Sequence, residues 1–346
     1  MTKKTTRAVI EGVWQALEMG SRSIQEIAGL AKTNWATAQR QLELLKSMEL
    51  VSEKEENGKR LFSRTVGSRK TNTLFGIPIS KEDENTINYI YMQARKIWRE
   101  RNNSPLSKTH AQKILANVNI KCSLNLPLGW YLYGEVCVKP YDPSEEYGYE
   151  APQHAAKLRG AVETSIDGFR GQQKVWQLER DYYRKRGKEL YILKNELAWL
   201  LYKNFSKDKL ENFCNGLLRL LVNVRKEEDT QGAVQALTEL IALSFTALNA
   251  KKFSLDEKFV ASLADTFREV WKHIALFEFC ASLAETKKFD EEQLWTRFTL
   301  SSLDQSWIVQ QQLAELTALI NSPVSEPQNE EEKKLKALQG SVKSQL

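Results

Sequence analysis

The sequence predicts a mostly α-helical protein, in which a small N-terminal domain with a short β-hairpin precedes a large all-helical bundle or helical-hairpin domain. Apolar residues recur at helical spacing along most of the chain. Two short runs, Leu50–Lys54 and Arg60–Thr65, flank an Asn-Gly pair, which favours a tight turn between two strands. The 346 residues, 42% of them hydrophobic, suffice for two domains or for one small and one large domain.

Composition divides the chain into five segments. A linker is expected where Gly, Ser, Thr and Pro occur without periodicity, and a disordered tail where Pro, Glu, Lys and Gln accumulate. The predicted segments are an N-terminal domain (1–66), a linker (67–79), a helical segment with an aromatic-rich loop (80–150), an α-helical bundle (151–321) and a tail (322–346).

Three helices are expected in the N-terminal domain. The first runs from Thr5 to Met19 and ends at Gly20, which suits a C-terminal cap. Ser23 is placed to cap a short second helix. The third lies within Thr33–Val51 and has two distinct faces. Its packing face carries Ala38, Leu42 and Leu45, and its opposite face carries Thr33, Ala36, Arg40 and Ser47.

This pattern resembles the winged helix-turn-helix DNA-binding domain of the MarR-like and ArsR-like transcriptional regulators, from about Thr5 to Arg64. The similarity is carried by the run from Thr37 to Leu42, the spaced leucines and the extended segment that follows. One residue departs from the family pattern: Glu49 stands where these families usually carry a glycine in a left-handed turn.

The resemblance implies that the third helix enters the major groove and that the hairpin is a wing. Arg40 and Gln39 would reach base edges, while Lys32, Lys59 and Arg60 would hold phosphates. Trp35, in the first turn, is expected to pack against the second helix, with a base or sugar contact as the alternative. The residues expected to contact DNA are Lys32, Thr33, Asn34, Ala36, Thr37, Gln39, Arg40, Lys59 and Arg60.

The distribution of charge agrees with this expectation. Residues 1–70 hold 13 Lys or Arg against 8 Glu, so they carry +5 of the chain's net charge of +6. A basic excess is what phosphate contacts require, although a few surplus lysines also keep a small domain soluble.

Beyond the linker, helix starts are expected at Ser80, Ser206, Ser254, Asp290 and Ser302, each with a carboxylate or amide side chain nearby. Long amphipathic segments between these starts, such as Gln172–Lys203, indicate antiparallel packing in a bundle.

Aromatic residues gather in Asn125–Glu150, which has no helical pattern. We expect them to pin a long loop to the helical core. The alternative is an effector pocket with aromatic walls. The residues concerned are Trp130, Tyr131, Tyr133, Tyr141, Tyr147 and Tyr149.

Motifs of the common enzyme classes are absent from the sequence, including the P-loop, GxGxxG, HExxH and GxSxG. The three histidines (His110, His154 and His273) and four cysteines are scattered without metal-ligand spacing. We therefore expect no catalytic residue, no metal site and no cofactor. No signal peptide and no apolar run of membrane-spanning length occur, so a cytoplasmic protein without membrane contact is expected.

Together these observations predict a DNA-binding transcriptional regulator. Its expected partners are double-stranded DNA and a second copy of the chain, and the helical part would dimerise, sense a small-molecule effector or dock a protein. Two alternatives stay open at this point. One is a nucleic-acid-processing factor, such as a replication or defence component of a plasmid or mobile element. The other is a protein-interaction scaffold that uses a winged helix.

Overall fold

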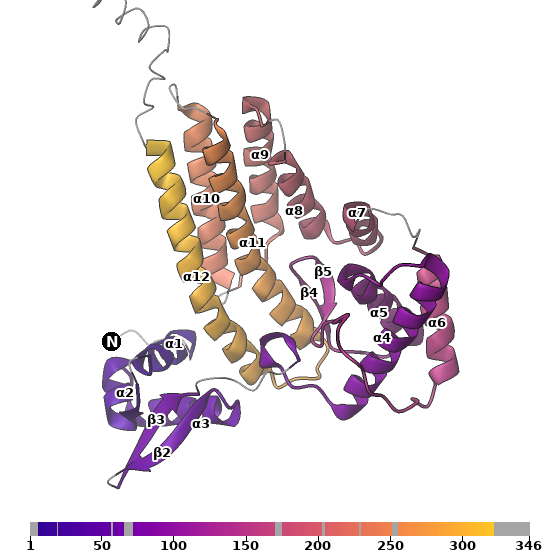
Figure 1. The fold of residues 1–346 in the computed structure, drawn as a ribbon. Helices are drawn as coiled ribbons and strands as arrows, with labels where there is room; N and C mark the ends of the chain where they lie inside the picture. The colour runs from indigo at the N-terminus through magenta and orange to yellow at the C-terminus, as the bar shows by residue number, and fades with distance from the viewer. Residues whose placement is uncertain are drawn as a thin grey trace, which may run out of the picture.

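The structure is a computed structural model that describes residues 6–18, 20–56, 58–65, 72–169, 175–202, 205–227, 230–250 and 255–321. Within these ranges it is mostly α-helical with two small antiparallel sheets, which confirms the predicted fold class in its coarse form. Figure 1 shows a small N-terminal unit, at the lower left, attached to one end of a large helical body. The tail predicted for 322–346 and the Asn57 half of the predicted turn lie outside the described residues.

Six elements make up the N-terminal unit. Its three strands form one antiparallel sheet in the order β1-β3-β2, with Val51 opposite Arg64 and Glu56 opposite Lys59. The elements are α1 (Thr6–Ala16), β1 (Arg22–Ser23), α2 (Ile24–Leu30), α3 (Trp35–Ser47), β2 (Val51–Glu56) and β3 (Lys59–Arg64).

Local signals explain where these helices begin. Ser23 caps α2 in a reciprocal capping box with Glu26, as expected from its position. Asn34 caps α3, because its Oδ1 accepts a hydrogen bond of 2.8 Å from the Thr37 N–H. The predicted packing face of α3 is confirmed, since Ala38, Leu42 and Leu45 are all fully buried. Local capping and the apolar pattern therefore place both helices.

Helix α3 ends in a left-handed residue that is not glycine. Glu49 has φ +58°, and the next N–H, that of Leu50, donates to the Leu45 carbonyl at 3.0 Å. This is a Schellman ending, which usually has glycine at the left-handed position. The chain therefore makes the left-handed turn with glutamate in place of glycine, at a cost of about 1–2 kcal/mol.

Twelve further elements form the body within the described residues. Helices α8 to α12 lie beside one another as a bundle, and α4 to α6 form a second group on the other side of a β-hairpin (Figure 1). The elements are η1 (Leu74–Gly76), α4 (Lys81–Asn102), α5 (Lys108–Cys122), β4 (Leu128–Tyr131), β5 (Gly134–Cys137), α6 (Ala155–Asp167), α7 (Val175–Lys185), α8 (Glu189–Leu200), α9 (Lys207–Asn223), α10 (Gln231–Asn249), α11 (Glu257–Glu285) and α12 (Glu291–Asn321).

The expectation of an all-helical body needs one correction. The segment predicted as an aromatic loop contains the β4–β5 hairpin, which packs against α5 and α11. Gly134 begins β5 with φ +96°, a conformation that L side chains rarely adopt. Trp130, Tyr141 and Tyr147 are buried, so these rings brace the body as expected.

Several predicted helix boundaries can be compared with the structure. Ser80, Ser206 and Asp290 cap α4, α9 and α12 as expected. Ser302 does not start a helix. It lies inside α12, where its hydroxyl donates to the Thr299 carbonyl at 2.7 Å. Ser254 lies outside the described residues, and Asp256 caps α11.

Another predicted boundary concerns the long segment Gln172–Lys203. In its described part it is two helices, α7 and α8, separated at Gly187, which has φ +62°. The segment is therefore not one continuous helix, because the left-handed glycine turns the chain.

Half of the predicted linker is packed onto the body. Leu74 N–H donates to the Val138 carbonyl at 2.7 Å, and the Phe75 ring lies 5.0 Å from that of Phe298. Ile77 is fully buried beside these residues. Residues 72–79 are therefore fixed in place by apolar packing.

The N-terminal unit shares its core with the body. Leu300, on α12, is only 7% exposed and packs among the buried side chains of α1, including Val9 and Val13. Arg297 donates to the Met48 carbonyl at 3.1 Å, at the end of α3. Burial of Leu300 therefore couples the folding of the two parts.

We expect Leu300→Ala to lower the free energy of unfolding by about 2–5 kcal/mol, because it removes a buried leucine from a core built mostly by residues 9–62. Chemical denaturation of the full chain measures this change. The control is Leu218→Ala, since Leu218 is 42% exposed on α9. Equal effects of the two substitutions would contradict the shared core.

Candidate nucleic-acid interface

The face of α3 expected to contact DNA is open to solvent. Ala36 and Arg40 are exposed, and Thr33, Thr37 and Gln39 are partly exposed. The opposite face is buried in the core of the unit. The structure therefore brings these five residues together on one accessible surface.

The start of α3 carries two further predicted residues, Lys32 and Asn34, and one that was not predicted to contact DNA, Trp35. Lys32 is exposed in a left-handed conformation with φ +50°, and the next N–H, that of Thr33, closes the end of α2 by donating to Ala28 O at 3.0 Å. Asn34 uses its side chain as the α3 cap. The expected packing of Trp35 is only partial, because 53% of it remains exposed. Its ring is thus available to a ligand, at a position that the apolar pattern assigned to packing.

An ion-pair network fastens the hairpin to α3. Arg60, on β3, contacts Glu53 on β2 and lies 2.8 Å from a carboxylate oxygen of Glu43 on α3. Lys46 Nζ lies 2.5 Å from the same Glu53. Arg60 was expected to hold phosphate, yet in this structure two carboxylates already contact it. Lys59 is exposed at the hairpin tip, with no ion pair within 4 Å among the described residues.

The network changes the acidity of Glu53. Hydrogen bonds from Arg60 and then Lys46 lower the pKa of this carboxyl from 4.5 to about 2. Hydrogen bonds with Glu53 and then with Glu43 raise the pKa of Arg60. Both groups therefore keep their charges throughout the neutral range.

Arg40 has a partner that lies 252 residues away in the sequence. Its Nη2 lies 2.9 Å from Oε1 of Glu292, in the first turn of α12. The Arg40 side chain is 71% exposed and that of Glu292 is 45% exposed. An ion pair this exposed contributes about 0–1 kcal/mol, so another anion can replace Glu292 with little loss of stability.

The surface as a whole mixes both signs of charge. Lys32, Lys59 and Arg40 project cationic groups, whereas Glu43, Glu292 and the glutamates of β2 project carboxylates nearby. A polyanion that contacts Arg40 or Arg60 here must compete with the glutamates that pair with them. The site is therefore suited to selective contacts more than to strong nonspecific attraction.

Other kinds of site have little support in the described part of the chain. It contains no group of three or more His, Cys, Asp or Glu side chains that could hold a metal ion. His110 and His273 are buried, and burial lowers the pKa of His273 to about 4. None of the helices described is long and apolar enough to cross a bilayer.

Comparisons with protein-family models, with curated proteins and with solved structures find no match for this chain.

The Glu53 network predicts a particular response to acid. Because the folded-state pKa of Glu53 is lowered, its contribution to stability is full above about pH 4.5 and is lost as the pH falls towards 2. Glu53→Gln should therefore make the melting temperature fall less steeply between about pH 5 and pH 3. Thermal melts across this range test the expectation. Glu55→Gln on the same strand is the control, and an unchanged acid dependence in Glu53→Gln would refute it.

Proposed function

We propose that residues 6–65 form a winged helix that binds duplex DNA and that the protein is a transcriptional regulator. The observation that carries this proposal is the two-sided character of α3, whose packing face is fully buried while its Ala36–Arg40 face is open. The order of the surrounding elements supports it. A short helix and turn precede α3, and a hairpin follows it in a three-stranded sheet.

In the proposed complex, α3 lies in the major groove. Gln39 and Arg40 approach base edges, and a bidentate contact from an arginine to guanine discriminates by about 1–3 kcal/mol. Lys32, Lys59 and Arg60 contact phosphates on either side. Thr33, Ala36 and Thr37 lie at the groove surface, and Asn34 retains its role as helix cap.

DNA binding as proposed requires the ion pairs of the free protein to rearrange. Glu292 must leave Arg40, and Glu43 must share Arg60, before either arginine meets DNA. The Arg40 side chain is largely exposed, so its exchange of Glu292 for DNA costs little. The helical body positions the unit through Leu300 and Arg297, so the proposed DNA surface has a fixed orientation relative to the body.

We infer that a homodimer of the full chain is the active form, because one such unit reads too few base pairs to discriminate well and symmetric half-sites are read by dimers. Selection from a randomised duplex library, followed by binding assays at several salt concentrations, tests the function. Each neutralised phosphate should contribute about −0.9 to the log–log salt slope, or about −3 for three cations per subunit. Failure to enrich any duplex, or affinity without salt dependence, would overturn the proposal.

The sharpest mutational test is Arg40→Ala. We expect it to weaken binding of the selected duplex by about 1–3 kcal/mol while the melting temperature stays unchanged, because Arg40 is exposed and outside the core. Arg219→Ala is a matched control, since Arg219 is also exposed and pairs with Glu189 at 3.3 Å. Equal affinities of Arg40→Ala and the parent protein at matched salt would exclude the assigned role.

A substitution of Glu292, the ion-pair partner of Arg40, tests the same role from the other side. Glu292→Gln should release Arg40 and raise DNA affinity about 1.5–5-fold, which is the range expected for one exposed ion pair. Glu189→Gln, which releases Arg219 instead, should leave DNA affinity unchanged. A rise in both variants would indicate a general effect of net charge, not a specific release of Arg40.

A further inference from the structure

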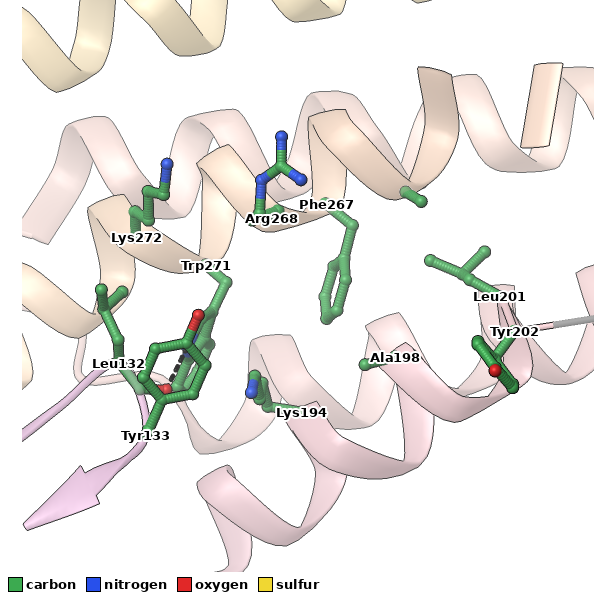
Figure 2. Close-up of a pocket in the computed structure, with 11 residues that line it drawn as sticks. Leu132, Tyr133, Lys194, Ala198, Leu201, Tyr202, Phe267, Arg268, Trp271 and Lys272 are labelled. Atoms are coloured by element: carbon green, nitrogen blue, oxygen red, sulfur yellow. Dashed lines mark hydrogen bonds between the residues drawn. The ribbon is translucent and has the colours of Figure 1, made fainter. Parts of the chain in front are cut away.

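A pocket of about 310 Å³ lies in the body, between α8, α11 and the turn that joins β4 to β5 (Figure 2). This volume is sufficient for a small organic molecule. Its walls are mainly apolar and aromatic, with two lysines and an arginine among them. The lining includes Tyr133, Lys194, Ala198, Leu201, Phe267 and Trp271.

The aromatic wall is held in place by buried contacts. The Trp271 indole N–H donates to the Leu132 carbonyl at 3.1 Å, as the dashed line in Figure 2 shows, and the ring meets Tyr191 edge-on at 5.1 Å. Trp271 is itself buried. The wall is thus largely formed before any ligand arrives, which lowers the entropy cost of binding.

The turn that carries Tyr133 is held by the buried side chain of Lys113. Lys113 is buried beneath it and donates from Nζ to the Tyr133 carbonyl at 3.0 Å. Burial lowers the pKa of Lys113 to about 8, with the charges of Glu179 and Glu135 acting in the opposite direction. The Tyr133 side chain, by contrast, is 63% exposed at the pocket mouth. Its backbone is therefore fixed while its ring remains accessible to a ligand.

Lys194 differs from the other cations of this pocket. Arg268 pairs with Asp265 at 3.0 Å, and Lys272 pairs with Glu269 at 2.7 Å. In the described part of the chain, Lys194 has no carboxylate oxygen within 4 Å, and its Nζ donates to the Asn195 side chain at 3.1 Å.

The surroundings of Lys194 are largely aromatic. Its Nζ lies 5.1 Å from the ring centroid of Tyr133 and 6.0 Å from that of Trp271. Burial lowers its pKa, and the more distant charge of Glu179 partly offsets this. An ammonium group removed from water without a paired carboxylate gains from an anion that reaches it.

We propose that this pocket binds a flat, largely apolar molecule with one anionic group, whose anion pairs with Lys194 while its apolar body lies against Trp271 and Phe267. Only one cation is without a carboxylate partner among the described lining residues, which favours a monoanion over a polyanion. The aromatic walls favour a planar body through ring stacking. Carboxylates and sulfonates share this chemistry.

Calorimetric titration of the full chain with 1-naphthoate tests the proposal, beside the uncharged 1-naphthalenemethanol. The acid should bind about tenfold or more tightly than the alcohol, the gain expected from one charge-assisted hydrogen bond. Lys194→Met should abolish that difference, whereas Lys157→Met, at an exposed lysine on α6, should preserve it. No DNA is present, so the outcome is independent of the proposed function.

A second variant, Ala198→Leu, keeps the proposal testable if Lys194→Met does not fold. Ala198 lines the pocket and is exposed, so Ala198→Leu fills space there without crowding the core. It should weaken the binding of both compounds and leave the melting temperature unchanged. Equal binding of acid and alcohol by the parent, or an acid–alcohol difference that persists in Lys194→Met, would overturn the proposal. So would undiminished binding in Ala198→Leu, or no binding of 1-naphthoate, 2-naphthalenesulfonate or 4-phenylbutyrate below about 1 mM.

Discussion

Burial of one long helix holds the two parts of this protein together. Helix α12 has 31 residues and is about 46 Å long. Its C-terminal half joins the main core of the body through Val309, Leu313 and Leu316. Leu294 and Phe298 enter a second core with the packed segment 72–79, and Leu300 enters the core of the N-terminal unit. Because one rigid element serves three apolar clusters, the position of each depends on the others.

Ion pairs add further contacts between elements that the apolar clusters already hold in position. The hairpin is joined to α3 by Arg60, and α3 is joined to α12 by Arg40. These pairs are exposed and individually weak, so they adjust the surface without determining the fold. The same residues are the ones proposed to meet DNA, which means that the free protein satisfies its own binding groups internally. In the proposed complex, binding at this surface is therefore an exchange of partners.

Features governed by neighbours in sequence were predictable. The caps at Ser23 and Ser80 follow from hydrogen bonds within one helical turn, and the burial of Leu42 and Leu45 follows from helical spacing. Ser302 resembles a cap in sequence, yet it is buried within α12, because tertiary packing carries the helix through it. A local signal is therefore reliable only where tertiary packing does not override it.

The candidate site was predictable only in part, for the same reason. The two faces of α3 follow from its pattern, and so does the open position of Arg40. Its partner Glu292 does not, because nothing in the sequence links residues 252 positions apart. The pocket could not be predicted from the sequence either, since Lys194 and Trp271 come from different helices. Of the aromatic residues singled out in the sequence, Tyr133 lines the pocket, whereas Trp130, Tyr141 and Tyr147 belong to the core.

The hairpin turn carries a constraint on how this sequence can diverge. A Cβ atom at Gly134 would lie 2.6 Å from Lys113 Nζ and 2.6 Å from the Tyr183 ring, and the backbone there has φ +96°. Any larger residue at 134 would therefore displace the buried lysine that holds the turn. In distant relatives that retain this hairpin, the residues at positions 134 and 113 should therefore covary. Glycine at 134 should occur together with lysine or arginine at 113. Such a linked pair offers a way to recognise kinship where overall similarity has faded.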